Sequence, residues 1–150
     1  MALSVLQNRG GPIWPLGYVN VAANGTKVCI MVNVDANNNY SPGGNYTPGS
    51  SVEYPATCRG IHVQGFKPGA GNNGMIPNNG NVYLLLAPQG SGTGNRADSG
   101  AMVAVIPPGA DYFLPASPIP MDMLQPNSFF IDVDNNNEGA VVALYGGGTT

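Results

Sequence analysis

The sequence is poor in charge, and it holds a single histidine and two cysteines in 150 residues. Charged side chains make up 9% of the chain, against about 25% in ordinary globular proteins. The five basic residues are scattered, so no basic stripe is available to neutralise nucleic-acid phosphates. No run of about 18 apolar residues occurs, which excludes an evident membrane-spanning helix. We therefore expect neither nucleic acid nor membrane as a partner.

The scarcity of histidine also limits catalysis and metal binding. His62 lies on a predicted strand, without a nucleophile motif nearby, so we expect a half-exposed strand residue and not a catalytic base. A zinc site needs several His or Cys ligands, and Cys29 and Cys58 are far apart in the sequence. The Gly-rich run 90–96 lacks the Lys-Ser/Thr of a phosphate-binding loop. We expect no enzyme activity, no catalytic residue, no cofactor and no metal.

Two cysteines are too few for a disulfide framework. We expect Cys29 and Cys58 to be buried free thiols, and the alternative is one disulfide formed after release from the cell. Residues 1–7 have no basic segment and only a short apolar run, unlike a secretory signal. The chain is therefore expected to be made in a cytoplasm and not to be exported by that route.

Glycine (22 residues) and proline (14 residues) are abundant, and they divide the chain into short β-rich runs. No segment shows helical periodicity over about ten residues. About eight strands are expected, in the runs 18–22, 26–34, 58–66, 81–88, 101–106, 112–114, 129–134 and 140–145. This pattern predicts an all-β fold, namely an antiparallel β-sandwich or jelly-roll-like barrel with long Gly/Asn/Pro loops.

Both ends of the chain differ from the middle in composition. We expect an extended N-terminal arm at 1–17, one β-sandwich domain at 18–146 and a flexible tail at 147–150. The arm carries the single tryptophan, and the polar loop 35–55 carries three tyrosines; both are good material for contacts with another molecule. The alternative is that each segment packs on its own domain. The expected interface residues are Ile13, Trp14, Tyr40, Tyr46 and Tyr54.

Two hairpins are expected within the domain. Asn24-Gly25 separates the runs 18–22 and 26–34, and Asn-Gly between β-rich runs is a strong hairpin signal. The runs 129–134 and 140–145 are expected to pair in the same way.

The second of these turns is rich in acidic residues. Asp132, Asp134 and Glu138 alternate with other residues as in the opening of a calcium loop. The flanking strands, the late glycine and the absence of a glutamate at the twelfth position depart from that motif. An Asp/Asn-rich turn is the plainer interpretation, and calcium binding remains the alternative.

The last third of the chain has a characteristic order of sequence segments. A strand ends in a Pro-Gly turn at 104–109, a Phe-Leu-Pro segment follows at 113–115, and two apolar strands follow at 129–133 and 140–144. This order, together with residues 1–15, resembles small structural proteins of tailed bacteriophages. The resemblance implies a non-enzymatic capsid decoration (cement) protein, which is often a homotrimer and binds between major capsid protein subunits. Its expected place is the outer surface of a virion assembled in the host cytoplasm.

Other functions compete with this interpretation. The runner-up is a tail, fibre or baseplate module that binds a receptor or glycan. An extracellular carbohydrate-binding module is the next alternative, because Trp14, Tyr40, Tyr46 and Tyr54 could offer aromatic platforms to a sugar. An enzyme is the last. Binding to glycans would favour the first two of these alternatives over a capsid protein.

Overall fold

The β-rich runs of the sequence become strands, separated by Gly-, Pro- and Asn-rich turns. The computed structural model describes residues 13–33, 40–42, 57–71, 74–86, 93–95, 101–116 and 123–146. Residues 1–12 of the expected arm and the expected tail at 147–150 lie outside these ranges. The strands are β1 (Ile13–Val21), β2 (Thr26–Cys29), β3 (Met31–Asn33), β4 (Tyr40–Pro42), β5 (Gly60–Gln64), β6 (Phe66–Pro68), β7 (Met75–Pro77), β8 (Val82–Leu86), β9 (Thr93–Asn95), β10 (Ala101–Ile106), β11 (Asp111–Pro115), β12 (Phe129–Val133) and β13 (Glu138–Tyr145), with the 3-10 turn η2 at Pro126–Ser128.

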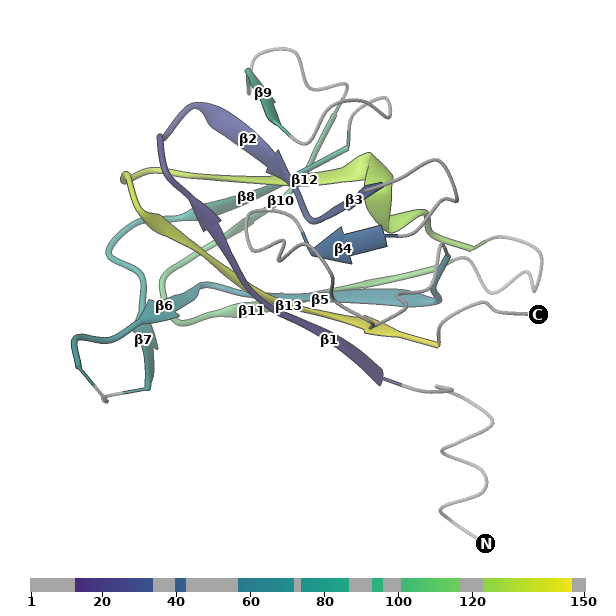
Figure 1. The fold of residues 1–150 in the computed structure, drawn as a ribbon, viewed down its shortest axis with the longest axis horizontal. Helices are drawn as coiled ribbons and strands as arrows, with labels where there is room; N and C mark the ends of the chain where they lie inside the picture. The colour runs from purple at the N-terminus through teal and green to yellow at the C-terminus, as the bar shows by residue number, and fades with distance from the viewer. Residues whose placement is uncertain are drawn as a thin grey trace, which may run out of the picture.

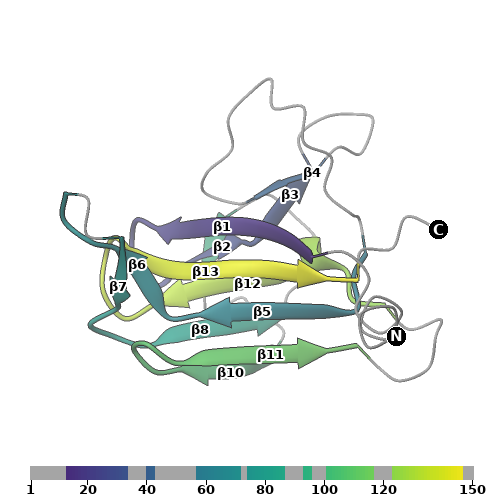
Figure 2. The same cartoon turned by 90° about the horizontal axis from the view of Figure 1, so that it is seen from below.

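Two antiparallel sheets pack face to face (Figures 1 and 2). Sheet A has the order β1-β13-β5-β11, and sheet B has the order β10-β8-β12-β2-β9. Figure 2 shows the strands of sheet A lying over those of sheet B. The pairs β3–β4 and β6–β7 form two small ribbons outside these sheets. The expected all-β sandwich is confirmed.

The chain changes sheet at nearly every step between the main strands. β8, β9 and β10 follow one another within sheet B. Apart from β9 and this one step, β1, β5, β11 and β13 of sheet A alternate along the chain with β2, β8, β10 and β12 of sheet B. This order is that of an eight-stranded jelly roll, in which two Greek keys wrap around each other. Such a path places turns from distant parts of the sequence at the same end of the sandwich.

Neither expected hairpin forms, and this corrects the prediction from the turn signals. β1 pairs with β13 and β2 pairs with β12, so residues 22–25 connect opposite sheets. In the same way, residues 134–137 connect β12 of sheet B with β13 of sheet A. We call these two connections arches. An arch lets both strands turn apolar faces toward one core, because the strands face each other through side chains and not through a backbone ladder.

The core lies between the two sheets. In β5, Ile61 and Val63 point inward while His62 and Gln64 point outward, because successive side chains of a strand alternate between its two faces. The buried residues of this core are Leu16, Val19, Val21, Val28, Ile30, Met31, Cys58, Ile61, Val63, Val82, Leu84, Ile106, Phe129, Ile131, Val133, Ala140, Val142 and Leu144. A smaller cluster of Cys29, Leu85 and Phe130 lies on the outer side of sheet B.

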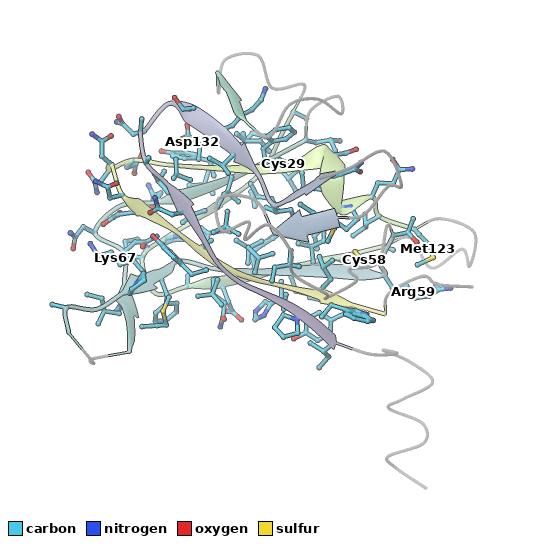
Figure 3. All side chains as sticks on the ribbon, viewed as in Figure 1. Cys29, Cys58, Arg59, Lys67, Met123 and Asp132 are labelled. Atoms are coloured by element: carbon cyan, nitrogen blue, oxygen red, sulfur yellow. The ribbon has the colours of Figure 1, made fainter. Side chains whose placement is uncertain are left out.

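Both cysteines are free and buried, which confirms the expectation of buried thiols. Cys58 belongs to the main core, and Cys29 belongs to the smaller cluster, so they lie in different parts of the fold (Figure 3). Burial raises the pKa of Cys29 to about 11 and that of Cys58 to about 12. Both groups therefore stay protonated and unreactive at neutral pH.

The first strand takes in the last five residues of the expected arm, 13–17. β1 begins at Ile13 and pairs with β13, with a bulge between Pro15 and Gly17, where Gly17 has a φ of 79°. Leu16 is buried, and Trp14 packs against the core. Residues 13–17 are thus part of the sandwich and not of a separate arm.

Deleting residues 1–17 should therefore destabilise the fold. The deletion removes Trp14 and Leu16 from the core, and loss of one buried leucine side chain alone costs about 2–5 kcal/mol. We expect the free energy of unfolding, measured by circular dichroism in urea, to fall by about 3 kcal/mol or more. Deleting residues 1–12, which keeps β1 whole, is the matched control. An unchanged urea midpoint for the longer deletion would contradict the packing of β1.

Candidate functional site

Polar turns gather at one end of the sandwich. The two arches, at 22–25 and 134–137, meet the turn at 78–81 that leads into β8. Lys67 and Asp132 both lie at this end, which is the left side of Figure 3. We call the three turns, with Asp132 and Glu138, the turn cluster.

Glu138 is the carboxylate with the most donors in this cluster. Its side chain is 2% exposed. Oε1 accepts hydrogen bonds from Lys67 Nζ at 2.7 Å and from the backbone nitrogen of Asn79 at 2.7 Å. Oε2 accepts from the backbone nitrogen of Gly80 at 3.1 Å and from Asn135 Nδ2 at 3.4 Å. Burial raises the pKa of Glu138, but these donors outweigh it, so the net pKa lies below the ordinary value.

The two aspartates of the cluster are bound in a similar way. Asp132 is fully buried, and its Oδ1 accepts a hydrogen bond from the backbone nitrogen of Gly25 at 3.0 Å. The carboxylate of Asp134 accepts from the backbone nitrogen of Asn81 at 2.9 Å and from the hydroxyl of Tyr83 at 2.6 Å. Each acid therefore caps a turn that comes from another part of the chain.

These contacts explain the acidic motif that resembled a calcium loop. The carboxylates of Asp132, Asp134 and Glu138 point at separate groups of backbone amides, and one of them also pairs with Lys67. In the described part of the chain, no three His, Cys, Asp or Glu side chains are grouped so that they could hold a metal ion. The arrangement is that of turn capping, which was the plainer of the two sequence interpretations.

The outer face of sheet A has a different character. Strand alternation turns the following residues away from the core: Ile13, Pro15 and Tyr18 of β1; Val141, Ala143 and Tyr145 of β13; Gly60, His62 and Gln64 of β5; Asp111, Phe113 and Pro115 of β11. Ile13 is 58% exposed and Phe113 is 49% exposed. Asp111 is the single charged residue that these four strands place on this face.

Aromatic rings organise one part of this face. The Phe113 and Tyr145 rings meet edge-on with centroids 5.5 Å apart, and His62 and Tyr145 meet edge-on at 6.3 Å. Nε2 of His62 lies 3.0 Å from Oδ2 of Asp111. Ile13 is the register partner of Tyr145 on the next strand. We call Ile13, His62, Phe113 and Tyr145 the aromatic patch.

A glycine makes room for the Phe113 ring on this face. The Phe113 ring lies directly over Gly60, so that any Cβ at position 60 would collide with the ring. Gly60 is the register partner of Tyr145 in β5, and the space above it is therefore available to the Phe113 ring. The patch is consequently held by backbone geometry and ring contacts together.

The predicted interface residues are divided by the structure. Ile13 lies on the aromatic patch, whereas Trp14 packs inward against the core, with a buried Nε1 that has no hydrogen-bond partner. Tyr40 lies in β4, but its side chain lies outside the described part of the structure, as do Tyr46 and Tyr54. His62 is 20% exposed, which confirms the expected half-exposed strand histidine.

The sequence interpretation missed Phe113 and Tyr145 as surface residues. Tyr112-Phe113-Leu114 is apolar throughout, so no polar neighbour marks which residue points outward. Tyr145 ends an apolar run, which gave it the same appearance as a core residue.

No family model, curated protein or solved structure matches this chain. No helix in the described part of the chain is long and apolar enough to cross a membrane. The fold and the surface chemistry of the chain are therefore the basis on which a function can be proposed.

Replacing Glu138 with Gln should make the free energy of unfolding depend less on pH in the acid range. A depressed folded-state pKa adds stability above the unfolded value of about 4.3, and this contribution is lost as the pH falls through the folded-state pKa. The difference in unfolding free energy between wild type and Glu138→Gln should thus shrink below about pH 4.3 in urea titrations. Asp111→Asn, at an exposed carboxylate, is the control. A difference that stays constant down to acid pH would contradict this account.

Proposed function

We propose that this chain is a non-enzymatic structural protein of a phage particle, which decorates the outer surface of the capsid. In this proposal the aromatic patch on sheet A binds major capsid protein subunits where they meet. The exposed aromatic patch on an almost uncharged sheet face is the observation that carries the proposal. The order of pieces in the last third of the sequence supports the choice of partner.

The chemistry of the patch suits a protein interface. Contiguous exposed apolar surface is typical of interaction sites, and phenylalanine and tyrosine are enriched in interface cores while acidic and lysine side chains are depleted. Phe113 and Ile13 are about half exposed, and Asp111 stands at the margin of the patch beside His62. Burial of the rings would supply the affinity, and the His62–Asp111 pair would contribute hydrogen bonds at the rim.

The backbone beneath the patch is part of sheet A. His62 and Tyr145 stand on the central strands β5 and β13, while Phe113 and Ile13 stand on the edge strands β11 and β1. A surface held on strands in this way loses less conformational entropy on association than a loop does. A weakly charged face suits a repeating protein lattice better than it suits a highly charged partner.

Assembly as a homotrimer is part of the proposal, and it rests on the resemblance to decoration proteins. Three copies of the patch would contact neighbouring capsid subunits at once, so that individually weak contacts add by avidity. An interface of about 1,600 Å² is enough for specific association of two proteins.

A glycan-binding tail or fibre module is the runner-up. Phe113 is exposed and Tyr145 is half-buried beside it on the outer face of sheet A, and aromatic rings on a sheet face can stack on sugars. However, the two rings are nearly perpendicular, at 87°, and do not form one continuous stacking platform. Seven of the twelve outward residues named above are apolar or glycine, and the nearest polar pair, His62 and Asp111, is already engaged with itself at 3.0 Å. These features favour a protein partner.

Binding of the chain to capsid shells tests the proposal. The purified protein would be mixed with shells assembled from a phage major capsid protein, and the pelleted fraction would be measured by sedimentation. Saturable binding at a fixed number of copies per shell is expected. Failure to bind shells, together with binding on a glycan array, would replace the proposal with the runner-up.

Phe113→Ser should weaken shell binding about tenfold or more. Truncation of an aromatic anchor at an interface hot spot costs about 2 kcal/mol or more. Met102→Ser is the matched control, since Met102 is 54% exposed and Phe113 is 49% exposed but they lie on different sheets. Sedimentation titrations would give both affinities. Equal losses in the two variants would contradict the assignment of the binding face.

A further inference from the structure

Two Asn-Gly pairs lie in the turn cluster and are held in the same way. The sequence contains the pairs Asn24-Gly25, Asn73-Gly74 and Asn79-Gly80. The first lies in the β1–β2 arch, and the last lies in the turn before β8. Asn73 lies outside the described residues. The first and last pairs both lie in the described part of the chain.

An Asn-Gly pair is a site of spontaneous chemical modification. The glycine backbone nitrogen loses its proton and attacks Cγ of the preceding asparagine, forming a new N–C bond. The Cγ–Nδ2 bond breaks, ammonia leaves, and a cyclic succinimide results. Water then opens the ring to aspartate or isoaspartate. The reaction needs no enzyme and no reactant other than water, and a glycine without a side chain offers the least hindrance to the attack.

The glycine nitrogen of the first pair is bound to a buried carboxylate. The nitrogen of Gly25 donates to Asp132 Oδ1 at 3.0 Å, and Asp132 has no exposed surface. The asparagine itself is also held: its backbone nitrogen donates to Asn136 Oδ1 at 2.9 Å, and its Nδ2 donates to the carbonyl oxygen of Asp134 at 3.0 Å.

The second pair has the same arrangement with a different acid. The nitrogen of Gly80 donates to Glu138 Oε2 at 3.1 Å, and the nitrogen of Asn79 donates to Glu138 Oε1 at 2.7 Å. Both asparagine side chains are exposed, so water has access to them. Exclusion of water therefore cannot be what protects either pair.

The fold requires glycine at both positions. Gly25 has a φ of 84°, which L side chains rarely adopt. A Cβ on Gly80 would lie 2.7 Å from Asp134 Cβ and 2.7 Å from Asn135 Nδ2. Replacement of either glycine would disturb its turn, so the reactive pairs cannot simply be avoided.

We propose that Asn24 and Asn79 are latent deamidation sites, which Asp132 and Glu138 keep unreacted by binding the glycine nitrogens. The hydrogen bond directs each N–H away from the asparagine that it would attack. The negative charge of the carboxylate also disfavours loss of the amide proton, because it opposes the anion that carries out the attack. Reaction then has to wait until the contact opens.

Loss of this protection would damage the turn cluster. Deamidation of Asn24 would replace the Nδ2 donor that bonds to the carbonyl of Asp134 and would add a negative charge close to Asp132. One of the two hydrogen bonds from Asn24 to the 134–137 arch would be lost, and like charges would repel each other. The inference is independent of the partner that the aromatic patch binds.

Peptide-resolved mass spectrometry tests the protection directly. The full chain would be aged at mildly alkaline pH, folded and in strong urea, and deamidation at Asn24 and Asn79 would be followed with time. We expect both sites to react about tenfold or more slowly in the folded chain, because a hydrogen bond to a charged group must open first. Equal rates in the folded and unfolded chains would overturn the proposal.

Two variants test which acid protects which site. Asp132→Asn should accelerate deamidation at Asn24 and leave Asn79 unchanged, whereas Glu138→Gln should do the reverse. Asp111→Asn, at a carboxylate outside the turn cluster, should change neither site. Acceleration of both sites by each variant in a folded protein would overturn the assignment of a separate acid to each pair.

Wild-type protein in low urea gives an answer even if a variant fails to fold. Protection by a local contact predicts rates at Asn24 and Asn79 that change little with urea below the unfolding transition, because the local opening exposes little surface. Rates that rise in parallel with the unfolded fraction would attribute the protection to global folding and would overturn the role of the two acids.

Discussion

Hydrogen bonds from backbone amides to carboxylates that are buried or half-buried hold one end of this jelly roll together. An arch connects two sheets, so its strands share no backbone ladder, and the amides of its turn need other partners. Asp132 binds an amide of the 22–25 arch, while Asp134 and Glu138 bind amides of the 78–81 turn. A buried amide without a partner would cost about 1–3 kcal/mol, so the position of each turn depends on these acids.

The placement of acidic residues in the turn cluster also affects the charge of the rest of the surface. The chain has eight acidic residues, and the turn cluster holds three of them close to the backbone it stabilises. Few charges are left for the sheet faces, and on sheet A only Asp111 faces outward. The concentration of acidic residues in the turn cluster therefore accounts both for the polar end of the sandwich and for the nearly uncharged outer face of sheet A. A surface of this kind associates through shape and apolar contact more than through long-range attraction.

Local sequence signals located the strands well, because alternation and turn residues act over a few positions. Ile61 and Val63 were recognisable as inward-facing from their alternation with His62 and Gln64. The pairing of strands was not recognisable in the same way. Asn24-Gly25 marks a turn correctly, but whether the flanking strands pair depends on partners elsewhere, and β1 takes β13. The turn signal alone contains no information about those partners.

The candidate site was less predictable than the fold. Ile13 and Trp14 are adjacent, and only strand geometry decides that Ile13 points outward while Trp14 packs on the core. Phe113 and Tyr145 belong to continuous apolar runs, where composition does not distinguish an exposed side chain from a buried one. The acids of the turn cluster were visible as a motif, but their partners lie about 50 to 110 positions away, so only the folded chain reveals their role.

The place of β13 in sheet A has a consequence for synthesis of the protein. β13 lies between β1 and β5, so β1 has no neighbour on its paired side until residues 138–145 have been made. A ribosome adds about 5–20 residues per second, and domains tend to fold as units. β1, the first strand to be made, therefore keeps its apolar face uncovered until β13, the last strand, has been made. During that interval the nascent chain avoids association with other chains only if few strands are available to pair with β1 or if chaperones cover it.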